Sequence, residues 1–61
     1  HLAQVAVLAD THYTVTKTAG DAPETVLTPV EGDERVAEVA RLLSGTATET
    51  SLAHARELLG Q

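Results

Sequence analysis

The sequence lacks cysteine, methionine, phenylalanine and tryptophan, and Tyr13 is its only aromatic residue. Without cysteine there is neither a disulfide framework nor a thiolate metal site, a composition compatible with a reducing cytoplasm. No apolar run approaches the roughly 20 residues that a membrane-spanning helix needs, and the first residues lack the basic-then-apolar order of a signal peptide. We therefore expect a soluble, cytoplasmic piece without a membrane partner.

Basic residues are also few. The sequence has four of them and nine acidic residues, which gives a formal net charge of −5. An acidic surface repels phosphate backbones, so we do not expect this chain to bind nucleic acid by itself. A chain of 61 residues forms at most one small domain, which buries only about 60% of the surface that its unfolded form exposes. The apolar content is carried by Ala, Val and Leu, which predicts a marginal core and leftover apolar surface.

The first half of the chain changes from helical to alternating periodicity. Residues 2–9 carry apolar side chains at helical spacing, namely Leu2, Val5, Ala6 and Ala9, and 10–11 form a plausible stop. Residues 12–18 alternate and are dense in β-branched types, which predicts a strand with Tyr13 and Val15 on one face. After a turn over 19–24, residues 25–30 resume strand character, and Pro29 predicts an edge. An antiparallel hairpin follows.

The second half predicts two helices. Gly32-Asp33 is the N-cap candidate of the first, its apolar stripe is Val36, Val39, Ala40 and Leu43, and Gly45 ends it. The last helix should run from about Ser51 to Leu59, capped by Thr48 or Thr50, with a weaker stripe of Leu52, Ala55 and Leu59.

The predicted fold class is therefore α+β, with a short helix, an antiparallel hairpin and two further helices. One core should contain apolar residues of the hairpin and the stripe of the helix that follows it, namely Val15, Val26, Val36, Val39, Ala40 and Leu43. Two strands do not form a stable sheet in isolation, which points to a fragment of a larger fold.

Three stretches resemble the RecN family, whose members are relatives of the structural-maintenance-of-chromosomes ATPases and of ATP-binding-cassette heads. Residues 1–6 are similar to the family's Thr-His-Leu-Pro-Gln-Val-Ala segment, although Ala3 stands where the family commonly has proline. Residues 33–45 resemble its Glu-Arg-Val-Glu-Glu-Ile-Ala-Arg-Met-Leu-Gly-Gly stretch, and 52–59 its closing Ala-His-Ala-Arg-Glu-Leu-Leu. His12-Tyr13, at the start of the predicted strand, also resembles the family's sequence, whereas the hairpin connection has no clear counterpart in it.

The resemblance implies the C-terminal part of an ATPase head that acts in DNA double-strand-break repair and recombination. It divides the chain into a switch-histidine loop and helix (1–11), a hairpin (12–31) and two helices (32–61). His1 would be the switch histidine near the γ-phosphate of ATP. The parent protein would use ATP and Mg²⁺, its partners would be the rest of this head, a second head and DNA, and it would be nucleoid-associated.

The segment itself is expected to be non-catalytic, because the phosphate-cradling glycine loop, the Mg²⁺-holding acid and the partner head's signature loop are absent from these residues. It should therefore neither hydrolyse ATP nor bind it tightly. The alternative interpretation of His1 is an incidental residue at a tag or cloning boundary.

Other candidate sites have simpler explanations. The histidines His1, His12 and His54 lack ligand spacing, so no metal site is expected, and His54 is interpreted as a solvated residue. Glu31, Asp33 and Glu34 suit the start of a helix better than acid–base chemistry. Arg35 and Arg41 each lie about one turn from Glu38, which predicts helix-surface ion pairs.

A rival function remains open at this point. The chain would then be a free-standing interaction module that forms a homodimer by packing the stripe of Val36, Val39 and Leu43 on a second copy.

Overall fold

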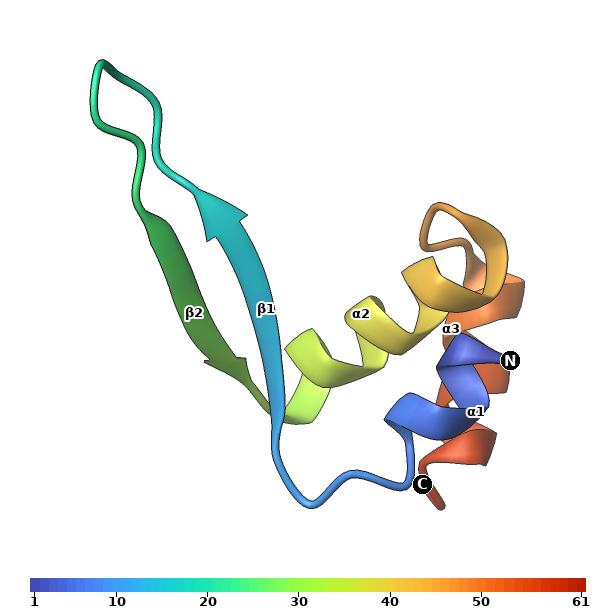
Figure 1. Cartoon of the computed structure of the whole chain (residues 1–61). Coiled ribbons are helices and arrows are strands. Elements are labelled where there is room, and N and C mark those ends of the chain that lie inside the picture. Colours follow the sequence, from blue (N-terminus) through green and yellow to red (C-terminus); the bar gives the residue numbers. More distant parts are fainter.

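The computed structural model describes residues 1–61 and confirms the α+β prediction (Figure 1). In chain order the elements are α1 (Leu2–Ala6), β1 (His12–Lys17), β2 (Thr25–Val30), α2 (Gly32–Ser44) and α3 (Glu49–Leu58). The three helices gather on one side, and the β1–β2 hairpin extends away from them. None of the helices has the length and apolar character required to cross a membrane.

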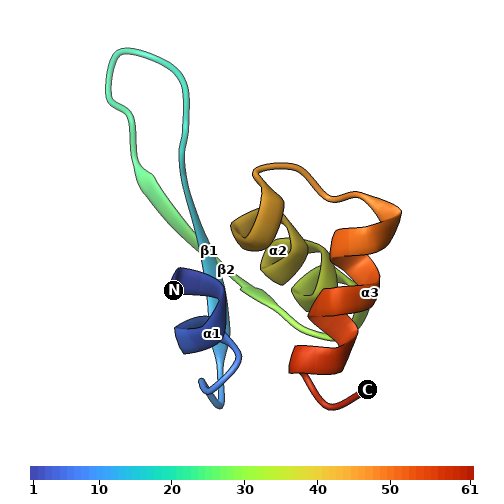
Figure 2. The same cartoon turned by 90° about the vertical axis from the view of Figure 1, so that its right-hand side faces the viewer.

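The core lies among the helices, where α2 packs against both α3 and α1 (Figure 2). The predicted stripe of α2 is confirmed, because Val36, Val39 and Ala40 are almost fully buried and Leu43 packs partly buried against them. The predicted stripe of α3 is confirmed as well, with Ala55 fully buried and Leu52 and Leu59 partly buried. Three of the five residues in this core are alanines, namely Ala3, Ala40 and Ala55, which suits a core without aromatic side chains.

The ends of the helices have identifiable local causes. Gly45 ends α2 as predicted, with a φ of 82° that residues with a side chain rarely adopt. Thr48 is the cap of α3, because its Oγ1 accepts from the Ser51 N–H at 3.1 Å while Ser51 Oγ accepts from the Thr48 N–H at 2.8 Å. This reciprocal pair starts α3 at Glu49, earlier than the predicted start.

The prediction of the α2 N-cap was wrong. Glu31, not Gly32 or Asp33, occupies the cap position, and its side chain makes no capping hydrogen bond. Gly32 instead is the first residue of the helix, with a φ of 57°. Asp33 and Glu34 do lie in the first turn, where their negative charge suits the helix dipole.

The hairpin is antiparallel, as predicted, with His12 opposite Val30 at its base and Lys17 opposite Thr25 toward its tip. Cross-strand partners share a face, so Tyr13 and Val15 lie on the same face as Pro29 and Leu27. We call these four residues the outer face of the hairpin. The structure leaves them exposed, with Val15 at 64% and Leu27 at 62%.

The predicted core was therefore wrong for the hairpin. Val15 is exposed, and Val26, on the opposite face, is 38% exposed. Only Val30, at the end of β2 where the chain enters α2, is buried. The cause is the direction of the hairpin, which leaves the helices at its base so that no element covers its outer face (Figures 1 and 2).

Candidate functional site

His1 lies directly before α1 as its N-cap residue and is exposed. Its backbone carbonyl accepts a hydrogen bond from the Val5 N–H at 3.1 Å, while its imidazole makes no hydrogen bond within the chain. The residue borders a shallow hollow of about 200 Å³ that is also lined by Leu42 and Leu43 of α2. The imidazole therefore sits at the surface, beside the C-terminal half of α2.

The helix that follows His1 is anchored by Ala3, which is 5% exposed and belongs to the buried core. The predicted apolar stripe of this helix was wrong, because Leu2 and Val5 are each 64% exposed and the helix ends at Ala6, short of Ala9. Ala3 and Val7 contact the core instead. Ala3 lies in the first turn, where a backbone N–H has no intrahelical partner, so the family's proline would cost no hydrogen bond there.

Arg35 joins the other end of this segment to α2. Its Nη2 donates to the carbonyl oxygens of Ala9 at 2.7 Å and Ala6 at 3.3 Å, and its Nε is buried without a partner. The predicted ion pair between Arg35 and Glu38 was therefore wrong. Sequence spacing along a helix suggests neighbours one turn away, whereas the actual partners lie 26 and 29 residues back in the chain.

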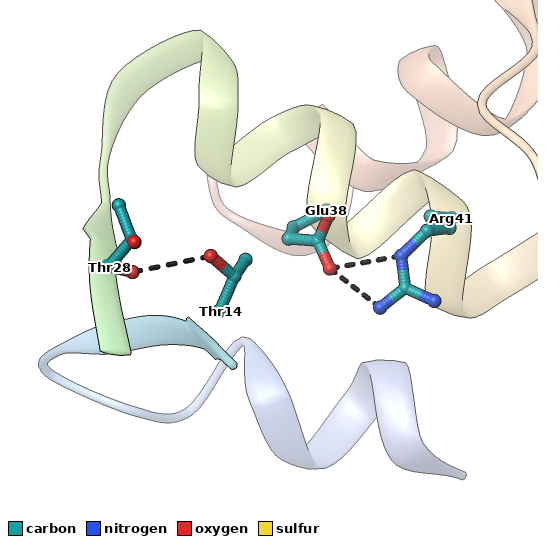
Figure 3. Close-up of polar contacts among 4 residues, drawn as sticks. All are labelled: Thr14, Thr28, Glu38 and Arg41. Atoms are coloured by element: carbon teal, nitrogen blue, oxygen red, sulfur yellow. Dashed lines mark hydrogen bonds and ion pairs between the residues drawn. The ribbon is translucent and has the colours of Figure 1, made fainter. Parts of the chain in front are cut away.

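Arg41 forms the ion pair predicted with Glu38 (Figure 3). Its Nη2 and Nε donate to the same carboxylate oxygen, Oε1, at 2.6 and 3.0 Å. The hydrogen bond from Arg41 lowers the pKa of the Glu38 carboxyl, against the opposing effect of partial burial. The pair is a solvated surface feature, since half of the Arg41 side chain is exposed.

A groove of about 700 Å³ separates the hairpin from the helices. The Glu38–Arg41 pair stands on its α2 side, and Thr14, which donates to the Thr28 carbonyl at 3.4 Å, lies between that pair and β2 (Figure 3). Leu2, Ala6 and Leu42 add apolar surface. Residues of both faces of β1 line this groove, because Tyr13 and Val15 border it together with Thr14 and Thr16.

The remaining candidates do not converge on one site. No group of three His, Asp or Glu side chains is arranged to hold a metal ion. His54, Glu31, Asp33 and Glu34 are exposed. His12, to which the sequence assigned no role, is half-buried at the base of the hairpin, and its Nδ1 has no hydrogen-bond partner.

Comparison with known proteins gives a consistent result, although no family model matches the chain. Over 61 residues the chain is 51% identical to the DNA repair protein RecN of Deinococcus radiodurans, and equally to that of Treponema pallidum. Over 63 aligned positions it is 41% identical to the RecN of Bacillus subtilis. These alignments cover 97–100% of the chain but 11% of each relative. The chain thus spans about a tenth of the length of the curated relatives it matches.

Proposed function

The chain belongs to the RecN family as a segment of a longer protein, and from this we propose that it is the C-terminal part of an ATPase head acting in DNA double-strand-break repair and recombination. The proposal is supported by identity along nearly the whole chain to relatives that are named DNA repair proteins. The segment is non-catalytic by itself, and the parent protein supplies the sites for ATP and Mg²⁺.

The observation that carries the proposal is the identity of 41–51% to RecN proteins along nearly the whole chain, and the imidazole of His1, directly before α1, is the switch group that we propose. In the parent head this imidazole donates a hydrogen bond to the γ-phosphate of ATP. A donor held in place before the reaction stabilises the charge that develops on the transferred phosphoryl group. The anchoring of α1 through Ala3 supports this role, because a preorganised donor must not move with a loose segment.

The outer face of the hairpin supports the proposed partners, which are the remainder of the head and a second head. Tyr13, Val15, Leu27 and Pro29 form an apolar surface that burial against further chain would stabilise. DNA contacts belong to other parts of the parent, because this segment carries a net charge of −5. Through those contacts the parent works on the nucleoid in the cytoplasm.

The alternative function, a free-standing dimerisation module, has to use a different surface from the one first considered. Val36 and Val39 are already buried within a single chain, so they are not available to a second copy. The outer face of the hairpin offers an exposed apolar surface for such contacts, and so do Leu2, Val5 and Leu8. Mass measurement of the isolated chain at low concentration tests this alternative, and a monomer would speak against it.

The decisive experiment for the main proposal is His1→Ala in the full-length parent. We expect ATP turnover to fall by about 10²–10³-fold, the usual effect of removing one preorganised donor, while nucleotide affinity stays near that of wild type. Steady-state ATPase assays beside equilibrium nucleotide binding measure the two quantities. Unchanged turnover would make His1 an incidental residue, and equal loss of binding and turnover would indicate a misfolded head.

A further inference from the structure

The segment that carries His1 is too short to hold its own position. Helix α1 has five residues, without an acid in its first turn and without a side-chain cap. Isolated helices of this length are not stable in water, because the cost of nucleation exceeds the gain from so few hydrogen bonds. Of its residues only Ala3 is buried. A second contact is needed to fix the direction of the helix.

Arg35 supplies this contact from α2. One nitrogen of its guanidinium, Nη2, donates to the carbonyl oxygen of Ala6, the last residue of α1, at 3.3 Å and to that of Ala9, three residues further along the chain, at 2.7 Å. The Ala6 carbonyl also accepts from the Ala9 N–H at 3.2 Å, and hydrogen bonds from a charged donor are about twice as strong as such neutral ones. The first turn of α1 is thus held by Ala3, and its end by Arg35.

The surroundings of Arg35 distinguish it from an ordinary surface arginine. Glu38, one turn further along α2, bonds Arg41 instead. The Nε of Arg35 is buried without a partner, which carries a desolvation cost. Arg35 therefore bonds the carbonyl oxygens of Ala6 and Ala9 and not the nearby Glu38 carboxylate, and its Nε is left without a partner.

We propose that Arg35 is a positioning residue for His1, fixing α1 on α2 so that the imidazole is held in a constant place for ATP hydrolysis. The hydrolytic part of this inference rests on the proposed function, whereas the mechanical part, that Arg35 holds α1, does not. His1 begins the segment, Ala3 anchors its first turn and Arg35 grips its last carbonyls, so motion at the Arg35 contact is transmitted over little more than one helical turn.

The test compares Arg35→Met with Arg41→Met in the full-length RecN protein that contains this segment. Both changes remove one guanidinium from α2 and keep an unbranched side chain, but Arg35 hydrogen-bonds the Ala6 carbonyl of α1 whereas Arg41 bonds Glu38. We expect Arg35→Met to speed hydrogen exchange at the Val5 and Val7 amides, which bond His1 and Ala3 carbonyls, by roughly tenfold or more. Arg41→Met should leave this exchange unchanged.

The rate of ATP turnover then tests whether the position of α1 affects hydrolysis through His1. Because a misplacement on the order of 1 Å can cost about 100-fold in rate, we expect Arg35→Met to lower kcat by about 10–100-fold at unchanged nucleotide affinity. In a His1→Ala background the same change should have no further effect, because a loss that acts through His1 cannot occur twice. Arg35→Lys, which keeps a charged donor, should recover part of the rate.

Each outcome decides a separate point. Unchanged exchange at Val5 and Val7 in Arg35→Met overturns the inference, whatever happens to turnover. Faster exchange together with a kcat loss that persists in full in the His1→Ala background also overturns it, since Arg35 would then act independently of His1. Faster exchange with no effect of His1→Ala alone refutes the proposed function and the hydrolytic role of Arg35, while the mechanical link stands. If Arg35→Met does not fold, Arg35→Gln, whose shorter, uncharged side chain does not span the same distance, carries the same measurements.

Discussion

The helices and the hairpin of this chain differ sharply in how much of their surface they bury. Of the seven buried residues, only Val30 belongs to a strand, and it lies where β2 meets α2. Helices α2 and α3 bury their apolar stripes and α1 buries Ala3, whereas the outer face of the hairpin remains exposed along its length. The helical part is thus structured by its own contacts, and the hairpin carries a surface suited to contacts with other chain.

This difference follows from how each element finds a partner. A helix with one apolar stripe is satisfied by a neighbouring helix, and α2 has such neighbours on either side in α1 and α3. A two-stranded sheet has two faces and two open edges, and two strands alone are marginal in water. Here Tyr13 and Val15 border the groove beside α2 together with Thr14 and Thr16, yet the side chains of the outer face remain exposed.

The largest difference between the helices and the hairpin is expected when a valine in each is replaced by aspartate. Val39→Asp places a carboxylate without a partner at a site that is 0% exposed, and the effective penalty for a buried charge is several kcal/mol. That is a large part of the 5–15 kcal/mol of stability typical of a whole domain, so we expect the helical part to unfold. Val15→Asp, at 64% exposure, should change stability far less. Circular dichroism during urea unfolding measures both, and similar losses would contradict the division.

A smaller loss of stability is expected within the helical part when the N-terminal cap of α3 is removed. Thr48→Ala removes both the hydroxyl that accepts from the Ser51 N–H and the partner of Ser51 Oγ, so we expect a loss of about 1 kcal/mol. Thr50→Ala is the matched control, because Thr50 is exposed and its side chain makes no hydrogen bond. Midpoints of urea unfolding compare the two variants. A larger loss of stability for Thr50→Ala than for Thr48→Ala would show that Thr48 is not the cap of α3.

The elements with a local signature were predictable from the sequence, and the relations between distant elements were not. The α2 stripe and the stop at Gly45 depend on residues within a few positions of one another, and the structure confirms them. Strand alternation defines two faces of the hairpin but does not say which one meets the helices. Nor does it say whether either face packs on the helices, and Val15 and Val26, which lie on opposite faces, are both exposed.

The candidate site was predictable only in part for the same reason. His1 was selected by resemblance, since nothing in its immediate sequence marks an exposed imidazole at a helix start as functional. Arg35 was missed because its partners, the carbonyls of Ala6 and Ala9, belong to the backbone and lie far back in the chain. Backbone acceptors leave no trace in residue types, so no spacing rule reveals them.

The smallest expected effect sharpens the comparison by measuring one substitution in two contexts. Val15→Thr keeps the shape of the side chain but adds a hydroxyl, and at an exposed position such a change usually stays within about 0.5 kcal/mol. In the 61-residue chain, where Val15 is 64% exposed, we therefore expect almost no shift in the unfolding midpoint. In the full-length parent the outer face is proposed to be covered, and burying a hydroxyl without a partner costs about 1–3 kcal/mol. Thermal unfolding of both proteins gives the two values. An equally small effect in the parent would mean that Val15 stays exposed there too. The hairpin would then project from the head as it projects from the helices of this segment. The remainder of the parent would have to contact this segment at another surface.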